Sequence, residues 1–219
     1  MSSEVEPTPS PMAAAVAVFA RRGYDEASVE DIAEAAGISR STFFRRYRSK
    51  EEVVFSDHEL LLQQVQEQLA ASAASRADAV EAVCAAAVAV FDHHVGLGEV
   101  SRARYRLVRA HPVLRDRELV MAHRYEVLFA RHLAGAVEDR DVARSCAAAV
   151  VTVHNLALRT WLEDGAGAHA DPASLLERLR RVSGLLTVPR SGRRRVVVLG
   201  VEGEESADQI AEVVRRALR

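Results

Sequence analysis

The stretch that decides the fold is VEDIAEAAGISRSTFFRRY, which runs from Val29 to Tyr47. A helix-turn-helix needs a first helix with a small inward residue, a turn that tolerates a left-handed residue, and a second helix that fits the major groove of DNA. Ala33 meets the first need, Gly37 meets the second, and Ile38 fills the turn with an apolar side chain. The stretch therefore predicts two helices joined by a tight turn.

The second of these helices, which Ser39 caps, has an inner and an outer side. Phe43 and Tyr47 lie four residues apart, so both are expected to face inward with Ile38. The same spacing places polar, basic and aromatic side chains on the outer side or at the helix N-terminus: Arg40, Ser41, Thr42, Phe44, Arg45 and Arg48.

Charge is concentrated in the same helix. From Ser39 to Lys50 the chain has five cationic residues and no acidic one, although the whole chain has a formal net charge of -2. Any DNA affinity must therefore come from a local patch, in which arginine can contact guanine edges or phosphates. The alternative, an arginine-rich solvated face, does not explain why the basic residues coincide with the turn.

The flanking segments are also predicted to be helical. An apolar stripe from Met12 to Ala20 precedes Gly23, a residue that suits a helix end. Ser28 and Asp31 resemble a capping box, and Ser49 begins a further helix. The rest of the alanine-rich chain is predicted to form helices at about 50–74, 76–95, 99–110, 113–138, 141–163 and 172–186.

We therefore expect an all-α protein with three parts. Residues 1–49 form a three-helix DNA-binding domain with a flexible arm at 1–11, and residues 50–188 form a second helical domain. Residues 189–219 form an extension in which Val196–Leu199 is a short strand and 206–218 a helix. We expect the strand to pair across a twofold axis with its mate, since a lone strand leaves its backbone groups unsatisfied.

Composition excludes several classes of protein. Hydrophobic residues make up 49% and charged residues 27% of the 219 residues, which is typical of a soluble globular chain. We see no signal peptide and no apolar stretch of about 18 residues, so we expect a cytoplasmic protein with no membrane partner. Cys84 and Cys146 lie in apolar runs and are expected to be buried thiols. No phosphate loop or nucleophile motif appears, so we expect neither an enzyme nor a cofactor.

Residues 12–56 resemble the DNA-binding domain of the TetR family of bacterial regulators. The resemblance rests on Gly23-Tyr24 after the first helix, on the turn from Ile32 to Ser39, on the aromatic-rich helix that follows, and on Ser49-Lys50-Glu51. The family usually has a tyrosine where this chain has Phe44, so a phosphate contact from a hydroxyl there is excluded.

The resemblance implies a homodimer that binds a double-stranded DNA operator. Arg40, Ser41, Thr42 and Arg45 would face the groove and its flanking phosphates, and Lys50 would hold a phosphate. The full set of candidate DNA-binding residues is Ser28, Ser39, Arg40, Ser41, Thr42, Phe44, Arg45, Arg48 and Lys50.

The second domain is expected to sense a small hydrophobic or amphipathic ligand. A pocket needs apolar and aromatic walls with a few polar groups. Candidates are Phe91, Tyr105, Met121, Tyr125, Phe129, His154 and Trp161, each of which could instead be plain core. A metal site is not expected, because Asp92, His93, His94, His123 and His154 are adjacent or remote rather than three or four residues apart.

The resemblance also implies a dimer interface built from the helices at 141–163 and 172–186. Plausible interface residues are Val150, His154, Leu158, Leu175, Leu179, Val182 and Leu186.

The leading functional hypothesis is a repressor that its ligand releases from a palindromic operator. Activation, and control by a protein partner through residues 190–219 without a small ligand, stay open.

Overall fold

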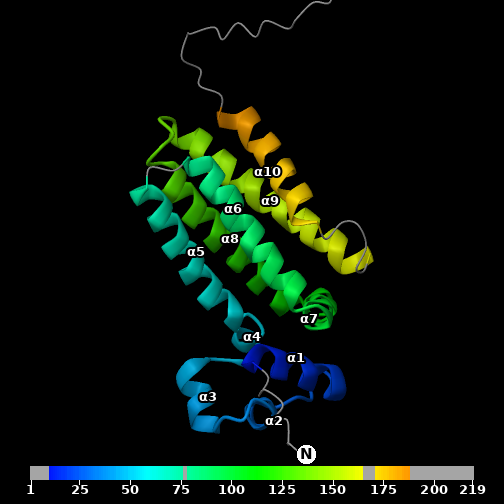
Figure 1. Ribbon diagram of the computed structural model, residues 1–219. Coiled ribbons are helices and arrows are strands. Elements are labelled where there is room, and N and C mark those ends of the chain that lie inside the picture. Colours follow the sequence, from blue (N-terminus) through cyan, green and yellow to red (C-terminus); the bar gives the residue numbers. More distant parts are fainter. Residues whose placement is uncertain (1–9, 76–77, 165–170, 188–219) are drawn as a thin grey trace, which may run out of the picture. The chain divides into compact units, whose positions relative to one another are not determined.

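The computed structural model describes residues 10–75, 78–164 and 171–187, which belong to one compact unit, 1–187. All regular structure in these ranges is helical, as the sequence predicts (Figure 1). The helices are α1 (Pro11–Arg22), α2 (Val29–Ala35), α3 (Arg40–Arg46), α4 (Lys50–Val53), α5 (Ser56–Ala74), α6 (Ala79–Gly96), α7 (Glu99–Ala110), α8 (Pro112–Leu133), α9 (Arg140–Asp164) and α10 (Pro172–Thr187). The predicted strand and helix of the extension lie outside the described residues.

Short-range hydrogen bonds and one glycine determine the start of α2 and the turn that leads into α3. The Ser28 hydroxyl accepts a hydrogen bond from the backbone N–H of Asp31, whose carboxylate accepts one from the Ser28 N–H, so the capping box is present. Gly37 has φ 65°, a left-handed conformation that disfavours other residues. The Ile38 N–H then bonds the Ala33 carbonyl at 2.9 Å. Phe43 is fully buried beneath this turn.

The helix predicted at 50–74 is in fact two helices, because α4 ends at Val53 and α5 begins at Ser56. The side chains of Val53, Val54 and Phe55 are all buried at this break. Consecutive residues of a straight α-helix are about 100° apart, so one helix cannot point three in a row at the same core. The break also places the start of α5 beside the pocket described below.

The helix predicted at 113–138 ends earlier, at Leu133. The Leu133 carbonyl accepts hydrogen bonds from the N–H groups of Ala136 and Val137, which close a turn around Gly135. The Asp139 carboxylate then caps α9 by accepting from the Asp141 N–H at 2.8 Å. A glycine within the predicted helix was therefore the boundary signal.

Helix α6 is the central core helix and packs against α5, α8, α9 and α10. Its mean hydropathy of 1.3 over 18 residues would suffice, by length and composition alone, to cross a membrane. The expectation that no stretch is this apolar was therefore wrong. Its contacts with four helices give the physical reason, since a helix surrounded by others is apolar on several sides.

The two cysteines are free, buried thiols, as the sequence predicts. Both lie beside the Ser183 hydroxyl, which is 3.7 Å from the Cys84 sulfur. Burial raises the pKa of the Cys84 thiol to about 11 and also raises the pKa of Cys146. These thiols are therefore protonated at neutral pH and contribute to the core.

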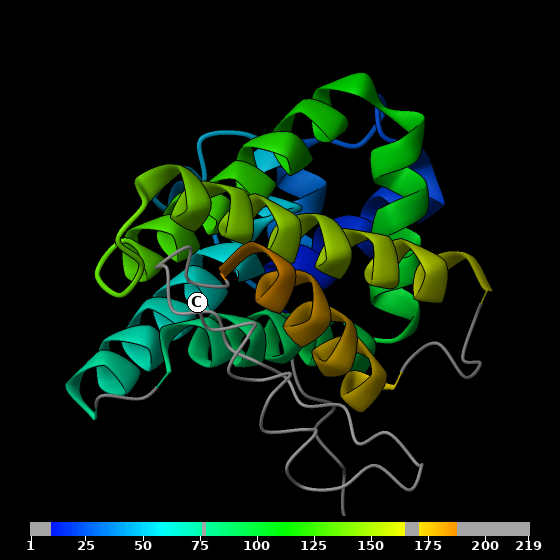
Figure 2. The ribbon, with the colours of Figure 1, turned by 90° about the horizontal axis from the view of Figure 1, so that it is seen from above.

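Helices α9 and α10 lie side by side (Figure 2). The interface prediction was wrong for Val150, His154, Leu175 and Leu179, because their side chains are buried within their own subunit. A helix buried on one face cannot offer those same residues to a partner. The predicted residues Leu158 and Val182 are half-buried, and the predicted Leu186 is exposed. Leu156 and Leu185, which were not predicted, are the other exposed large apolar side chains of this helix pair.

Candidate functional site

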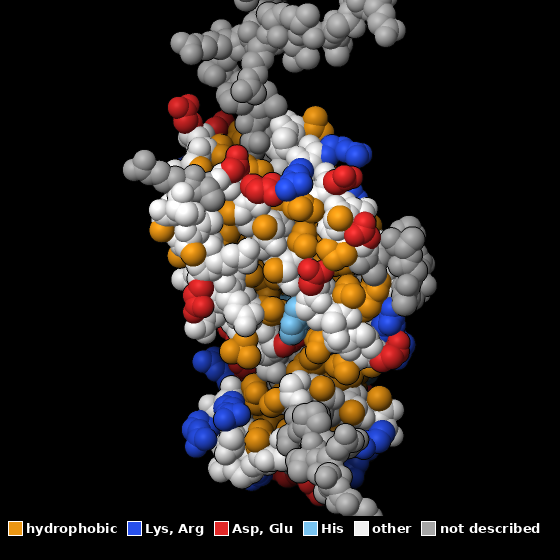
Figure 3. Space-filling model, in the orientation of Figure 1, with side chains coloured by type: hydrophobic (Ala, Val, Ile, Leu, Met, Phe, Trp, Pro, Cys, Tyr) orange, Lys and Arg blue, Asp and Glu red, His pale blue; other side chains and the backbone are white. Residues whose placement is uncertain are grey.

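Helix α3 presents a basic outer surface. Arg40, Ser41, Phe44 and Arg45 are exposed and Thr42 is half-buried. Arg48, just beyond the helix, is exposed as well. Lysine and arginine side chains gather at the place of α3 in the lower left of the space-filling view (Figure 3). The residues predicted to face outward thus share one exposed surface.

Several predicted DNA contacts also have partners within the protein. The Arg40 guanidinium is 2.5 Å from the Glu30 carboxylate and lies over the Phe44 ring at 5.3 Å. The hydroxyls of Ser28 and Ser39 cap α2 and α3. The guanidinium groups of Arg45 and Arg48, in contrast, have no hydrogen-bond or ion-pair partner in the described part of the chain. Among the predicted DNA contacts, they are the cations most available to a phosphate or a base.

Lys50, the first residue of α4, contacts the loop between α1 and α2. Its ammonium group donates to the Tyr24 carbonyl at 2.6 Å and approaches the carbonyls of Asp25 and Ala27 at 3.5 and 3.4 Å. It also lies over the Tyr24 ring at 4.4 Å. These contacts use the donors of the ammonium to hold the loop between α1 and α2. A phosphate contact from Lys50 stays a prediction.

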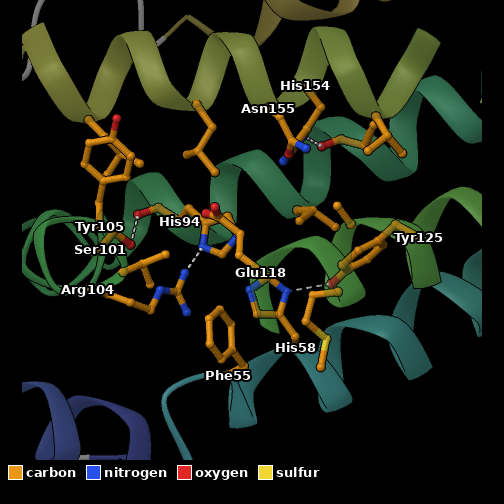
Figure 4. A pocket seen from close by; sticks show the side chains of 18 of the residues that line it. Phe55, His58, His94, Ser101, Arg104, Tyr105, Glu118, Tyr125, His154 and Asn155 are labelled. Carbon is orange, nitrogen blue, oxygen red and sulfur yellow. Dashed lines mark hydrogen bonds between the residues drawn. The ribbon is translucent and has the colours of Figure 1, made fainter. Parts of the chain in front are cut away.

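A pocket of about 810 Å³, open mouth included, lies among helices α5 to α9 (Figure 4). Five of the seven predicted pocket residues line it: Tyr105, Met121, Tyr125, Phe129 and His154. Phe91 and Trp161 are not among the lining residues. Phe91 is fully buried in the core, and Trp161 lies beneath the Arg102 guanidinium, 4.4 Å from its ring centre.

The pocket wall contains a buried ion pair that the sequence analysis missed. Arg104 of α7 donates to both carboxylate oxygens of Asp57 of α5, at 3.0 and 2.9 Å. Its other terminal nitrogen is 2.8 Å from Nδ1 of His94 (Figure 4). The His93 ring lies 3.2 Å from the same carboxylate. Side-chain exposure is only 9% for Arg104 and 12% for Asp57, so the two charges compensate each other away from bulk water.

This arrangement disfavours a metal ion. The ligand atoms of Asp57, His93 and His94 lie within 4.8 Å of one another, a spacing that a metal could use. The Arg104 guanidinium already binds Asp57 and His94. A divalent cation would have to displace a buried positive charge whose partner would then be lost. The cluster is therefore an ion-pair network.

Three imidazoles, those of His58, His94 and His154, border the pocket and are held neutral. Burial lowers the pKa of His58 to about 3 and that of His154 to about 4, and it places the pKa of His94 well below its usual value. The Arg104 guanidinium lowers the pKa of His58 and His94 further. His154 Nδ1 donates to the Ala87 carbonyl at 3.0 Å, which fixes its tautomer and leaves Nε2 as an acceptor.

The pocket residues missed by the sequence analysis include Phe55, His58, Ser101, Arg104, Glu118 and Asn155. A weak signal existed for α7. Ser101, Arg104 and Val108 are spaced three and four residues apart, which places all three on one helix face, and all three are buried. An arginine on a face shared with valine was the sign of a buried charge.

The pocket is connected to the DNA-binding helices through α7. This helix contributes pocket residues and packs directly against α1. At the end of α7, the His111 ring stacks on the Tyr24 ring with centroids 4.3 Å apart. The Tyr24 hydroxyl donates to the Glu51 carboxylate at 2.5 Å, and burial with this contact raises the pKa of Tyr24. Tyr24 thus contacts both the α7–α8 corner and α4.

Comparison with known proteins gives a consistent result. Residues 12–56 match the family model of bacterial regulatory proteins of the tetR family. The chain is 31% identical over 155 residues to the mycofactocin biosynthesis transcriptional regulator MftR of Mycobacterium tuberculosis, covering 68% of this chain and 77% of that protein.

Solved structures have the same fold. A TetR-family regulator from Syntrophomonas wolfei aligns with a TM-score of 0.61 at 15% identity, over 87% of this chain and 96% of that one. FadR from Bacillus subtilis, solved in complex with stearoyl-CoA, aligns with a TM-score of 0.54 at 22% identity, over 78% and 96%. The chain therefore belongs to the TetR family of transcriptional regulators.

Proposed function

We propose that this regulator is a dimeric repressor that binds a palindromic operator through a helix-turn-helix and is released by a small molecule. The observation that carries the proposal is that one compact unit holds both an exposed basic helix, α3, and a lined pocket, and that the pocket helix α7 packs against α1, which in turn packs against α2 next to α3. A DNA surface and a ligand site connected through packed helices are the minimum for ligand-controlled binding.

In the proposed complex, α3 enters the major groove. The guanidinium groups of Arg45 and Arg48, which have no partner among the described residues, would contact guanine edges or phosphates, and Ser41 and Thr42 present hydroxyls beside them. Phe44 is 48% exposed and offers an apolar contact, which suits a thymine methyl group. Arg40 can contact a phosphate by exchanging its ion pair with Glu30, since both side chains are solvent-exposed.

The first prediction concerns Arg45. Arg45→Ala is expected to weaken operator binding by about 1–3 kcal/mol if the side chain contacts a base, because a bidentate contact is lost. The measurement is a fluorescence-anisotropy titration on a duplex enriched from a random pool by the wild-type protein. Arg144→Ala is the matched control, since Arg144 is also exposed but lies on α9. Equal affinities for wild type and Arg45→Ala would show that the recognition face is wrongly placed.

Dimerisation follows from the length of α3. A helix of 7 residues covers only a few base pairs, so two half-sites about one DNA turn apart are needed for affinity. The exposed Leu156 of α9 and the exposed Leu185 and Leu186 of α10 give these helices an apolar outer surface. We place the dimer interface there, in place of the buried residues that the sequence suggested.

We place the ligand site in the pocket among α5 to α9. Its apolar and aromatic walls fit a hydrophobic or amphipathic molecule. Two neighbours in fold, FadR of Bacillus subtilis and FadR of Thermus thermophilus, were solved with stearoyl-CoA and lauroyl-CoA. A thermal-shift screen against hydrophobic metabolites that includes these esters tests the site, because a bound ligand raises the stability of the folded state.

The second prediction concerns the connection between the two sites. We expect His111→Ala to preserve ligand binding but to reduce the loss of DNA affinity that the ligand causes, because the stacked contact with Tyr24 is removed. The measurement is DNA affinity with and without a ligand found by the screen. His123→Ala is the control, since His123 is exposed on α8. An unchanged ligand effect in His111→Ala would exclude this contact as the connection.

Control by a protein partner without a small ligand is less well supported. That hypothesis relied on residues 190–219, which lie outside the described residues. The lined pocket favours a small molecule.

A further inference from the structure

We propose that the ligand carries a positive charge, which the carboxylate of Glu118 binds within the pocket. This inference rests on the proposed function, since it specifies the chemistry of the molecule that the pocket takes. It comes from the charges that line the pocket rather than from the shape of the cavity.

Two charged side chains line the pocket, and only one of them is neutralised. Arg104 is paired with Asp57 at 2.9 Å. Glu118, which is half-buried, has no hydrogen-bond or ion-pair partner among the described residues of the chain. Figure 4 shows Glu118 in the middle of the lining, between His94 and His58. The pocket therefore contains a carboxylate that no side chain or backbone group in the described part of the chain satisfies.

The other titratable groups add no compensating charge. His58, His94 and His154 line the pocket, and burial lowers the pKa of each far enough to keep the ring neutral at pH 7. With Arg104 cancelled by Asp57, the pocket carries a net charge of about -1 from Glu118. A partly buried charge without a partner is unfavourable. A cationic ligand would remove this penalty when it binds.

The walls around Glu118 also suit a cation. Phe55, Tyr105, Tyr125 and Phe129 contribute aromatic rings to the lining. The negative faces of such rings attract an ammonium or other organic cation, most strongly where water is excluded. A carboxylate among aromatic side chains therefore fits an amine or quaternary ammonium attached to an apolar body.

An acidic ligand is the obvious alternative, because a buried arginine commonly binds a carboxylate. In this pocket the Arg104 guanidinium already donates to both oxygens of Asp57 and contacts His94. An entering anion would have to break that pair or leave two carboxylates to share one cation. The anion would also be repelled by the Glu118 carboxylate, which has no partner among the described residues. Both the Asp57–Arg104 pair and Glu118 therefore disfavour an anionic ligand.

The test compares three probes with the same chain and different charge: octyltrimethylammonium, octanol and octanoate. We expect isothermal titration calorimetry on the full-length protein to rank the cation tightest and octanoate weakest. Glu118→Gln should weaken binding of the cation by about tenfold, because an interaction between charges in a partly buried site is lost. Octanol binding should be unchanged in this variant, which also shows that the pocket is intact.

Asp116→Asn is the matched control, since it removes the same charge from an exposed position of the same helix. It should leave all three affinities unchanged. If octanoate or octanol binds tighter than the cation, or if Glu118→Gln leaves the ranking as it was, the charge inference is overturned while the pocket stands as the ligand site. If none of the three probes binds and the metabolite screen also finds no ligand, both the charge inference and the proposed ligand site are overturned.

Discussion

Arg104→Gln is expected to lower the free energy of unfolding by about 3–5 kcal/mol, the typical loss when one partner of a buried ion pair is removed. The reason is the position of Asp57, whose carboxylate is 12% exposed and accepts two hydrogen bonds from the guanidinium. Without Arg104, the His93 ring at 3.2 Å is the one hydrogen-bond partner left to the Asp57 carboxylate within the described ranges. Urea unfolding followed by circular dichroism at pH 7 measures the loss.

The matched control is an exposed ion pair on the same part of the molecule. Arg124 binds the Glu59 carboxylate with both terminal nitrogens, yet the two side chains are 41% and 55% exposed. Arg124→Gln should therefore cost at most about 1 kcal/mol, because water replaces the lost partner. A similar loss in both variants would show that the burial of the Arg104 pair has no energetic consequence.

A double variant separates lost attraction from the penalty of an isolated charge. Asp57→Asn combined with Arg104→Gln leaves neither charge in the pocket wall, so much of the stability lost in Arg104→Gln should return. A double variant that is as unstable as the sum of both single variants would contradict this account. It would indicate that the helices need these side chains for packing rather than for charge compensation.

The DNA-binding helices were predictable because their signals are local. The capping box of Ser28 and Asp31, the left-handed Gly37 and the Ser39 cap each involve residues within a few positions of one another. Such contacts depend on backbone geometry that the chain determines by itself. The break between α4 and α5 was missed because it depends on which side chains the core buries.

The pocket was only partly predictable because its chemistry is non-local. Asp57 and Arg104 are 47 residues apart and lie on helices whose pairing no periodicity shows. The need of a ligand pocket for apolar and aromatic walls suggested a lining, and five of the seven candidates lie there. Trp161 shares a helix face with His154, but it lies where Arg102 of α7 covers it. The spacing of residues along a helix shows which of them share a face. It does not show which other helix packs against that face.

Stability is expected to fall steeply between pH 7 and pH 5, because three neutral histidines are buried in the pocket wall. In the unfolded chain each imidazole takes up a proton near pH 6.5. In the folded chain burial holds the pKa of His154 at about 4, that of His58 at about 3, and that of His94 well below 6.5. Between these values the unfolded state binds more protons, so stability decreases as the pH falls.

The size of this effect follows from the number of protons taken up on unfolding. Each histidine contributes about 1.4 kcal/mol per pH unit once its unfolded form is fully protonated, so the three together approach about 4 kcal/mol per unit near pH 5. The pKa of Asp57 is lowered as well, but its contribution is lost only below the unfolded pKa of about 4. The histidines therefore dominate the window from pH 7 to pH 5.

His154→Gln tests this interpretation at one position, since glutamine can still donate to the Ala87 carbonyl but does not titrate. Urea unfolding at a series of pH values should show a slope reduced by about one proton in this variant. His123→Gln is the control, because the His123 side chain is 70% exposed. A wild-type slope in His154→Gln would mean that His154 takes up its proton in the folded protein. The surroundings of His154 would then contain more water and more charge than the buried, neutral imidazole described above.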